Sequence, residues 1–174
     1  MISNLTSAGA VHTALAGGCI LLGAIQLLLA KGGAGHRARG YAFVYGMLTA
    51  DAAALLIVRF TGHFNILHVG AIANVACILL AMVPLLRSPR PANWMVWHYT
   101  FIAWSYVGLL AAATTELIVR VIQPSTAVEA WGLTAIMTAL VTVLGYVLIN
   151  RYRPPGDPQG RSRRAEVQQN GVSL

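Results

Sequence analysis

Two histidines in apolar stretches have the spacing that a bound cofactor would need. His12 lies 19 residues before Lys31, and His68 lies 19 residues before Arg87. In a helix that rises about 1.5 Å per residue, both imidazoles would lie about 28 Å from the basic end of their segment, and therefore at one depth. Two imidazoles at one depth on alternate helices are what bis-histidine ligation of a haem b requires inside a bundle.

The same two histidines would also suit a zinc or copper ion. A carboxylate, Glu116 or Asp51, would then complete the ligand set, since imidazole and carboxylate groups bind both metals. Spacing alone does not separate these possibilities from a third, in which His12 and His68 are ordinary hydrogen-bonded residues and no cofactor is bound. All three stay open at this point.

One face of the segment 94–121 carries polar and ionisable residues from end to end. A charge at mid-bilayer costs about 2.5–3.5 kcal/mol by insertion scales, so this face should look into the bundle, where partners exist. The alternative is an ion pair within one helix, because Glu116 precedes Arg120 by four residues and Arg120 could also reach the headgroups. The face comprises His98, Ile102, Ser105, Leu109, Ala112, Glu116 and Arg120.

The composition indicates a membrane protein. The hydrophobic set makes up 57% of the 174 residues and only 10% are charged, whereas about a quarter is usual in soluble domains. Each of five apolar runs is long enough to cross a bilayer, and each must be helical because the hydrocarbon region offers backbone groups no water. The sequence therefore predicts an all-α, polytopic membrane helix bundle with five transmembrane helices at about 9–30, 41–60, 64–86, 94–121 and 128–150.

Lysine and arginine are distributed unevenly over the connections. Ten of the 12 fall in the 31–39 and 87–93 connections and in the tail, and the other two are Arg59 and Arg120. Cytoplasmic loops collect positive charge, so we expect the N-terminus outside and the C-terminus in the cytoplasm. The net charge of +7 then reflects topology, and no nucleic-acid partner is expected.

Two parts of different character make up the chain. Residues 1–150 form a single transmembrane domain, with the first apolar run retained as a helix because no basic n-region precedes it and no clear cleavage site follows it. Residues 151–174 are polar and rich in Pro, Gly and Gln, which predicts a disordered basic cytoplasmic tail near anionic lipid headgroups. Before the fifth helix, Ser125 or Thr126 should act as the N-cap, with Glu129 in the first turn.

No catalytic signature fixes a reaction class. The sequence contains no GxSxG, Walker, CxxC or HExxH motif. Cys19 and Cys77 stand alone in different apolar runs, as small buried residues do. Whether the protein is an enzyme stays open.

Three stretches carry a resemblance to a known family: AGHRARGYAFVYGMLTADAAAL, GHFNILHVGAIAN and WHYTFIAWSYVGLLAAATTELIVRV. Over roughly residues 10 to 122 the chain resembles the domain of unknown function 2306 family of bacterial predicted membrane proteins. That resemblance implies a multi-pass bundle in the bacterial cytoplasmic (inner) membrane. It implies no established activity.

The chain is also similar, more weakly, to cytochrome b561-type haem proteins. These pair histidines across helices one and three, and across helices two and four, of a four-helix core. By this similarity His12 and His68 would form the outer pair, and His36 and His98 the inner pair. His36 departs from the pattern, since it falls at or before the expected start of the second helix.

Three functions therefore follow as expectations. The first is an electron-transfer protein with haem b on His12 and His68, with Arg120 pairing a propionate and Glu116 and Asp51 in the polar surroundings. The second is a zinc- or copper-dependent membrane enzyme with His12, His68, Glu116 and Asp51 as ligands. The third is a non-catalytic accessory subunit or small transporter. The expected partners are the lipid bilayer, anionic lipids at the basic face, and a homodimer or a larger membrane complex.

Overall fold

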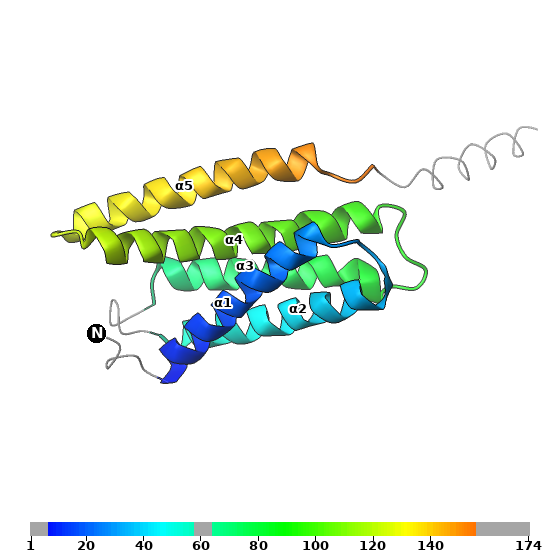
Figure 1. Cartoon of the computed structure of the whole chain (residues 1–174), viewed down its shortest axis with the longest axis horizontal. Coiled ribbons are helices and arrows are strands. Elements are labelled where there is room, and N and C mark those ends of the chain that lie inside the picture. Colours follow the sequence, from blue (N-terminus) through cyan, green and yellow to red (C-terminus); the bar gives the residue numbers. More distant parts are fainter. Residues whose placement is uncertain (1–6, 58–63, 156–174) are drawn as a thin grey trace, which may run out of the picture.

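A computed structural model describes residues 7–57 and 64–155, and within these ranges it is all helical, as predicted (Figure 1). The end of the second predicted helix, Arg59, His63 and most of the tail lie outside the described residues. The helices are α1 (Ser7–Leu28), α2 (Gly33–Leu55), α3 (Ile66–Leu86), α4 (Trp94–Ile122) and α5 (Ala127–Arg151).

Four of the helices, α1, α3, α4 and α5, are long and apolar enough to cross a membrane. Their outward faces expose large apolar side chains that a soluble protein would bury, among them Leu21, Leu79 and Val143. Such apolar faces suit a hydrocarbon environment. The second helix is not among the four, because its apolar residues are interrupted by His36, Arg37, Arg39 and Asp51.

Helices α1 to α4 form a closed ring. Each contacts the next along the chain, and α4 contacts α1, whereas α5 contacts α4 alone. Two diagonals, α1 with α3 and α2 with α4, therefore face each other across the bundle without backbone contact. The fifth helix lies outside this four-helix unit, along the length of α4 (Figure 1).

The middle of the four-helix unit is apolar. Met47, Ile78 and Cys19 are almost completely buried there, and Leu109 of α4 joins them. Tyr106 holds α4 close to α1. Its ring packs against Gly23, and its hydroxyl donates a 3.0 Å hydrogen bond to the carbonyl of Ile20. This apolar layer separates polar groups on either side of it.

The second helix begins earlier than predicted. We expected a start near residue 41, where the apolar run begins, but α2 starts at Gly33. Gly32 and Gly33 have φ of +85° and +73°, values that favour glycine, and they reverse the chain directly after α1. The polar residues that follow are already helical, because hydropathy marks where a helix turns apolar and not where it begins. His36 therefore lies inside α2.

Two helices, α3 and α5, begin with a capping box, in which two side chains accept each other's backbone N–H groups. Thr126 accepts from Glu129 N–H at 3.2 Å while the Glu129 carboxylate accepts from the backbone before it, so the prediction of a cap at Ser125 or Thr126 is confirmed for Thr126. Asn65 and His68 make the corresponding box at α3. Both boxes satisfy N–H groups that a helix start leaves without partners.

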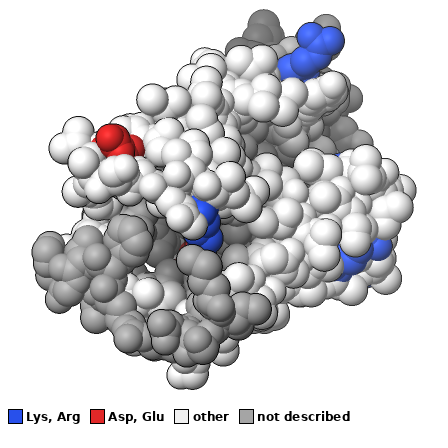
Figure 2. Space-filling view, turned by 60° about the vertical axis from the view of Figure 1, so that its left-hand side comes forward, with Lys and Arg blue, Asp and Glu red and all other residues white. Residues whose placement is uncertain are grey.

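Positive charge gathers at the end of the bundle where α1, α3 and α5 end. At the opposite end the described residues carry Arg120, paired with Glu116, and Glu129. Figure 2, with that opposite end turned forward, shows a mostly uncharged surface. The basic residues at the first end are Lys31, Arg37, Arg39, Arg87, Arg90, Arg151 and Arg153.

Candidate functional site

One polar cluster, the Asp51 layer, consists of His12, Asp51 and Asn74 from three different helices. Asp51 is buried, with 7% of its surface exposed. Its Oδ2 accepts a 2.8 Å hydrogen bond from the Asn74 amide. His12 Nδ1 donates to the carbonyl of Ala50 at 2.9 Å, and the imidazole lies close enough to Asp51 for their charges to interact. A buried carboxylate thus has one amide donor and one imidazole neighbour.

The fourth wall of the Asp51 layer offers unused hydrogen-bonding capacity. Asn74 Oδ1 is buried, has no hydrogen-bond partner among the described residues, and points toward α4, where a Cβ at Gly108 would lie 3.8 Å from it. One turn away on α4, Ser105 Oγ is fully buried and likewise has no partner in the described part of the chain. Such groups cost about 1–3 kcal/mol each when left unpaired, so a polar ligand or a water molecule bound here would be stabilising.

His68 lies apart from the Asp51 layer. It precedes Asn74 by six residues on α3, which is about 9 Å along the helix. Its Nδ1 accepts the Asn65 N–H at 3.2 Å, and its ring stacks on Phe64. Its Nε2 is buried and has no hydrogen-bond partner among the described residues. His68 thus caps the start of α3 through one ring nitrogen, and its other ring nitrogen is left for a further contact.

The depth expected from residue counting fails for His12 because α1 is tilted. Figure 1 shows α1 crossing the other helices obliquely, so each of its residues advances less along the bundle than the full helical rise. Counting from Lys31 therefore places His12 too far out. The register of α1 on α2 puts it beside Ala50, and so at the level of Asn74 and not of His68.

A second polar cluster, the His36 layer, lies at the basic end. Gln26 organises it: its amide donates to His36 Nδ1 at 2.7 Å and to the His36 carbonyl at 2.9 Å. Arg39 Nε donates in turn to Gln26 Oε1 at 2.9 Å. His98 on α4 donates from Nδ1 to the carbonyl of Ala81 at 3.0 Å. His36 and His98 lie near the starts of α2 and α4, at the same end of the bundle and on opposite ends of one diagonal.

The tautomers implied by these contacts decide how well each histidine suits a haem iron. Ligation through Nε2 requires the proton on Nδ1, where a backbone carbonyl commonly accepts it. His12 and His98 have this arrangement. His36 and His68 accept a hydrogen bond at Nδ1, which leaves the proton on Nε2. Each predicted pair therefore contains one imidazole with its proton on Nδ1, as ligation through Nε2 requires, and one whose proton would have to move from Nε2 to Nδ1.

Glu116 and Arg120 form an ion pair within α4, which was the alternative weighed for them. Arg120 Nε donates to Glu116 Oε1 at 3.1 Å, and both side chains are exposed. The polar face of α4 is buried at Ser105 and Leu109, whereas Glu116 and Arg120 farther along it are exposed. The buried residue at that level is Thr115, whose hydroxyl lies 3.4 Å from that of Thr138 on α5.

The four residues expected to bind zinc or copper are not gathered in one place. His12 and Asp51 are neighbours, whereas His68 lies farther along α3 and Glu116 is exposed on α4. Over residues 7–57 and 64–155, no three His, Cys, Asp or Glu side chains are grouped as a metal ion would require.

Two residues of these layers, Asn74 and Gln26, stood out in the sequence only as polar. A usable signal exists for Gln26. Antiparallel helices joined by a short loop bring together residues about equidistant from that loop, and Gln26, two residues before the end of α1, pairs with His36, three residues after the start of α2. Pairing polar residues across that loop would have found this contact, whereas Asp51 and Asn74 lie four and eight residues from the facing ends of α2 and α3. No family model, no curated protein and no solved structure matches this chain.

Proposed function

We propose that this chain is an integral membrane electron-transfer protein in which His36 and His98 hold a b-type haem. The observation that carries the proposal is their position: His36 lies near the start of α2 and His98 near the start of α4, at one end of the bundle, on diagonal helices whose backbones do not touch. A haem ligated from both sides needs this opposition of two imidazoles inside a bundle. Such a haem would supply reversible one-electron transfer.

The surrounding residues have definable tasks in this proposal. Gln26 holds the backbone carbonyl of His36, and the Ala81 carbonyl fixes the tautomer of His98. Arg39, held by Gln26, offers a guanidinium to a propionate. Ligation by His36 requires its proton to move to Nδ1, with the Gln26 amide releasing that nitrogen.

The second diagonal supports a second haem less directly. His12 is set for ligation, and the buried Nε2 of His68 has no hydrogen-bond partner among the described residues. The two histidines lie at different levels along the bundle, which makes this pair the weaker candidate. Among the described residues Arg120 is the cation at that end, and its pairing with a propionate would compete with Glu116.

The orientation in the membrane is part of the proposal. The basic residues gathered at one end support a cytoplasmic location for that end, with five spans, the N-terminus outside, and the bacterial inner membrane as the site. The resemblances to the domain of unknown function 2306 family and to cytochrome b561-type proteins agree with this arrangement.

An absorption spectrum of purified protein tests the haem. After expression with haem supplementation, dithionite-reduced protein should show a Soret band and a b-type α-band. His98→Ala and His36→Ala should each remove at least one haem equivalent, whereas His63→Ala, the control histidine outside both pairs, should keep the full content. Wild-type protein without any haem band, or unchanged haem in His98→Ala, would refute the proposal.

A zinc or copper centre is the second candidate, favoured by the proximity of His12 to Asp51. His12 keeps Nε2 free toward a ligand, and a carboxylate is already beside it. Elemental analysis of wild type against His12→Ala, Asp51→Asn and His68→Ala separates this candidate from the haem. Metal content that stays the same in all three variants would exclude it.

A further inference from the structure

A groove of about 510 Å³ lies where α4 begins and α5 ends. One wall is a single stripe of α4, because Asn93, Trp97, Thr100 and Phe101 recur at helical spacing. The other wall is the chain just after α5, with Arg153. The Tyr99 hydroxyl joins the two helices beside the groove through a 3.3 Å hydrogen bond to a carbonyl near the end of α5.

The lining of the groove changes from polar to apolar. Asn93 makes no side-chain cap to α4, and Arg153 has no carboxylate partner among the described residues. About two turns along α4 from Asn93, Thr100 Oγ1 is buried and has no hydrogen-bond partner in the described part of the chain. The Trp97 and Phe101 rings, with centroids 5.8 Å apart, form an aromatic floor that leaves Trp97 46% exposed.

Among the residues that the structure describes, the charge around the groove is of one sign. The acidic residues that the structure describes, Asp51, Glu116 and Glu129, all lie outside it, in the bundle interior or at the opposite end. Arg90, over the ring of Trp94, adds a further cation close to the start of α4. An occupant should therefore be anionic at the mouth and apolar below it.

We propose that this groove binds one anionic phospholipid. Its phosphate would lie at Arg153 and the Asn93 amide, as guanidinium and uncapped helix starts favour anions. The Thr100 hydroxyl would donate to an ester carbonyl, which lies below the phosphate in a phospholipid. One acyl chain would cover Trp97 and Phe101. This is a defined site, distinct from the general attraction of a basic surface for anionic lipid.

Native mass spectrometry of the full chain in mild detergent tests the site, with phosphatidylglycerol or phosphatidylcholine as the added lipid. Wild-type protein should bind one phosphatidylglycerol more tightly than phosphatidylcholine. Arg153→Gln should weaken phosphatidylglycerol binding about tenfold, the value of one charge-assisted contact. Thr100→Val, which removes the unsatisfied hydroxyl at nearly constant volume, should also weaken it.

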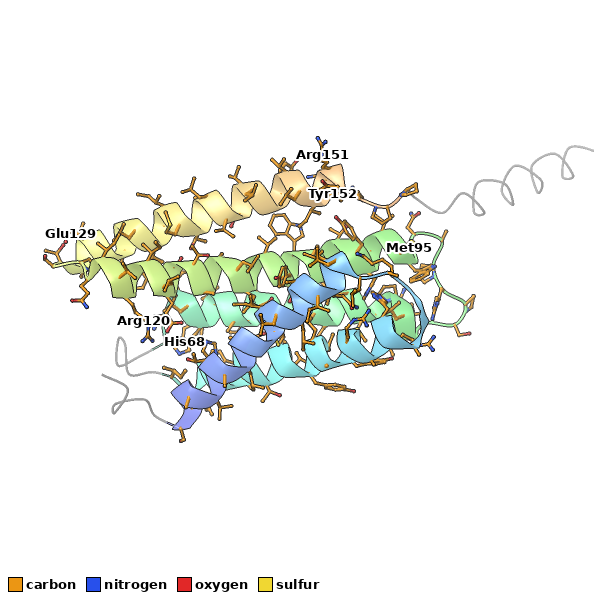
Figure 3. All side chains as sticks on the ribbon, in the orientation of Figure 1. His68, Met95, Arg120, Glu129, Arg151 and Tyr152 are labelled. Carbon is orange, nitrogen blue, oxygen red and sulfur yellow. The ribbon has the colours of Figure 1, made fainter. Side chains whose placement is uncertain are left out.

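Arg151→Gln is the matched control. It removes the same charge two residues away, and Figure 3 shows Arg151 at the end of α5, directed away from the bundle. Its effect should stay below about twofold. Equal losses in Arg153→Gln and Arg151→Gln would overturn the proposal, because general surface charge would then explain binding. Phosphatidylglycerol binding unaffected by Arg153→Gln would overturn it as well.

Discussion

The indole N–H of Trp97 on α4 donates a 2.9 Å hydrogen bond to the carbonyl of Leu80 on α3. This is the carbonyl that Pro84, inside α3, leaves without its helical donor, because proline has no N–H to offer four residues later. His98 donates to the adjacent carbonyl, that of Ala81. Trp97 therefore supplies the donor that Pro84 lacks, and the neighbouring hydrogen bond to the Ala81 carbonyl fixes the orientation of His98.

Trp97→Phe should lower the free energy of unfolding by about 1 kcal/mol, because the Leu80 carbonyl loses its donor while an aromatic ring is kept. In a Pro84→Ala background the helix supplies that donor itself, so the same substitution should cost less. Unfolding of detergent-solubilised protein, measured for all four combinations, gives the coupling. Equal costs in both backgrounds would show that Trp97 does not substitute for the missing N–H.

The helices were predictable because the bilayer imposes a simple rule. A run of about 20 apolar residues satisfies its backbone only as a helix, so hydropathy located five helices. The start of α2 was missed because Gly32 and Gly33 reverse the chain and a polar helical turn follows. We expected all five helices to span the membrane, whereas length and composition support four of them, α1, α3, α4 and α5.

The site was less predictable because depth and direction depend on packing. The tilt of α1 shifts His12 away from the level of His68, and no residue count contains that tilt. Similarly, Glu116 is exposed while the neighbouring Thr115, in contact with Thr138 of α5, is buried, although periodicity along α4 alone puts Glu116 on the face of Ser105. The contact across the short α1–α2 connection, Gln26 with His36, is the part that sequence could have supplied.

Gly23→Ala should destabilise the bundle by about 1–3 kcal/mol, as overpacking does. An added methyl group at Gly23 would overlap the ring of Tyr106, whose hydroxyl is already fixed by Ile20. Gly17→Ala is the control on the same helix, since a methyl group there meets nothing within 4 Å. Thermal unfolding of both variants should show a loss for Gly23→Ala only; similar midpoints would contradict the close approach of α1 and α4.

Thr126→Ala should cost about 0.5–2 kcal/mol, the usual value of an N-cap. The Thr126 hydroxyl accepts the Glu129 N–H at the start of α5. Ser125→Ala provides the comparison, because Ser125 contributes its backbone N–H, and not its hydroxyl, to the Glu129 carboxylate. Denaturant unfolding should show the larger loss of unfolding free energy for Thr126→Ala. A larger loss for Ser125→Ala would contradict the assignment of Thr126 as the N-cap.

Asn74→Ala should lower the free energy of unfolding more than most substitutions that remove a single hydrogen bond from this chain. It removes the amide that donates to the buried Asp51 carboxylate, and hydrogen bonds to charged groups are worth about 1.5–3 kcal/mol. Asn150→Ala is the matched control, because that exposed amide donates only to the Tyr146 carbonyl of its own helix, and it should cost less than about 0.5 kcal/mol.

Asp51→Asn should rescue part of the loss caused by Asn74→Ala, because a neutral amide tolerates burial beside apolar atoms better than an unpaired carboxylate does. The free energies of unfolding of the single and double variants give the coupling between the two positions. A coupling near zero would mean that Asp51 takes its stabilisation from elsewhere, and His12, whose imidazole lies beside it, would be the first residue to replace.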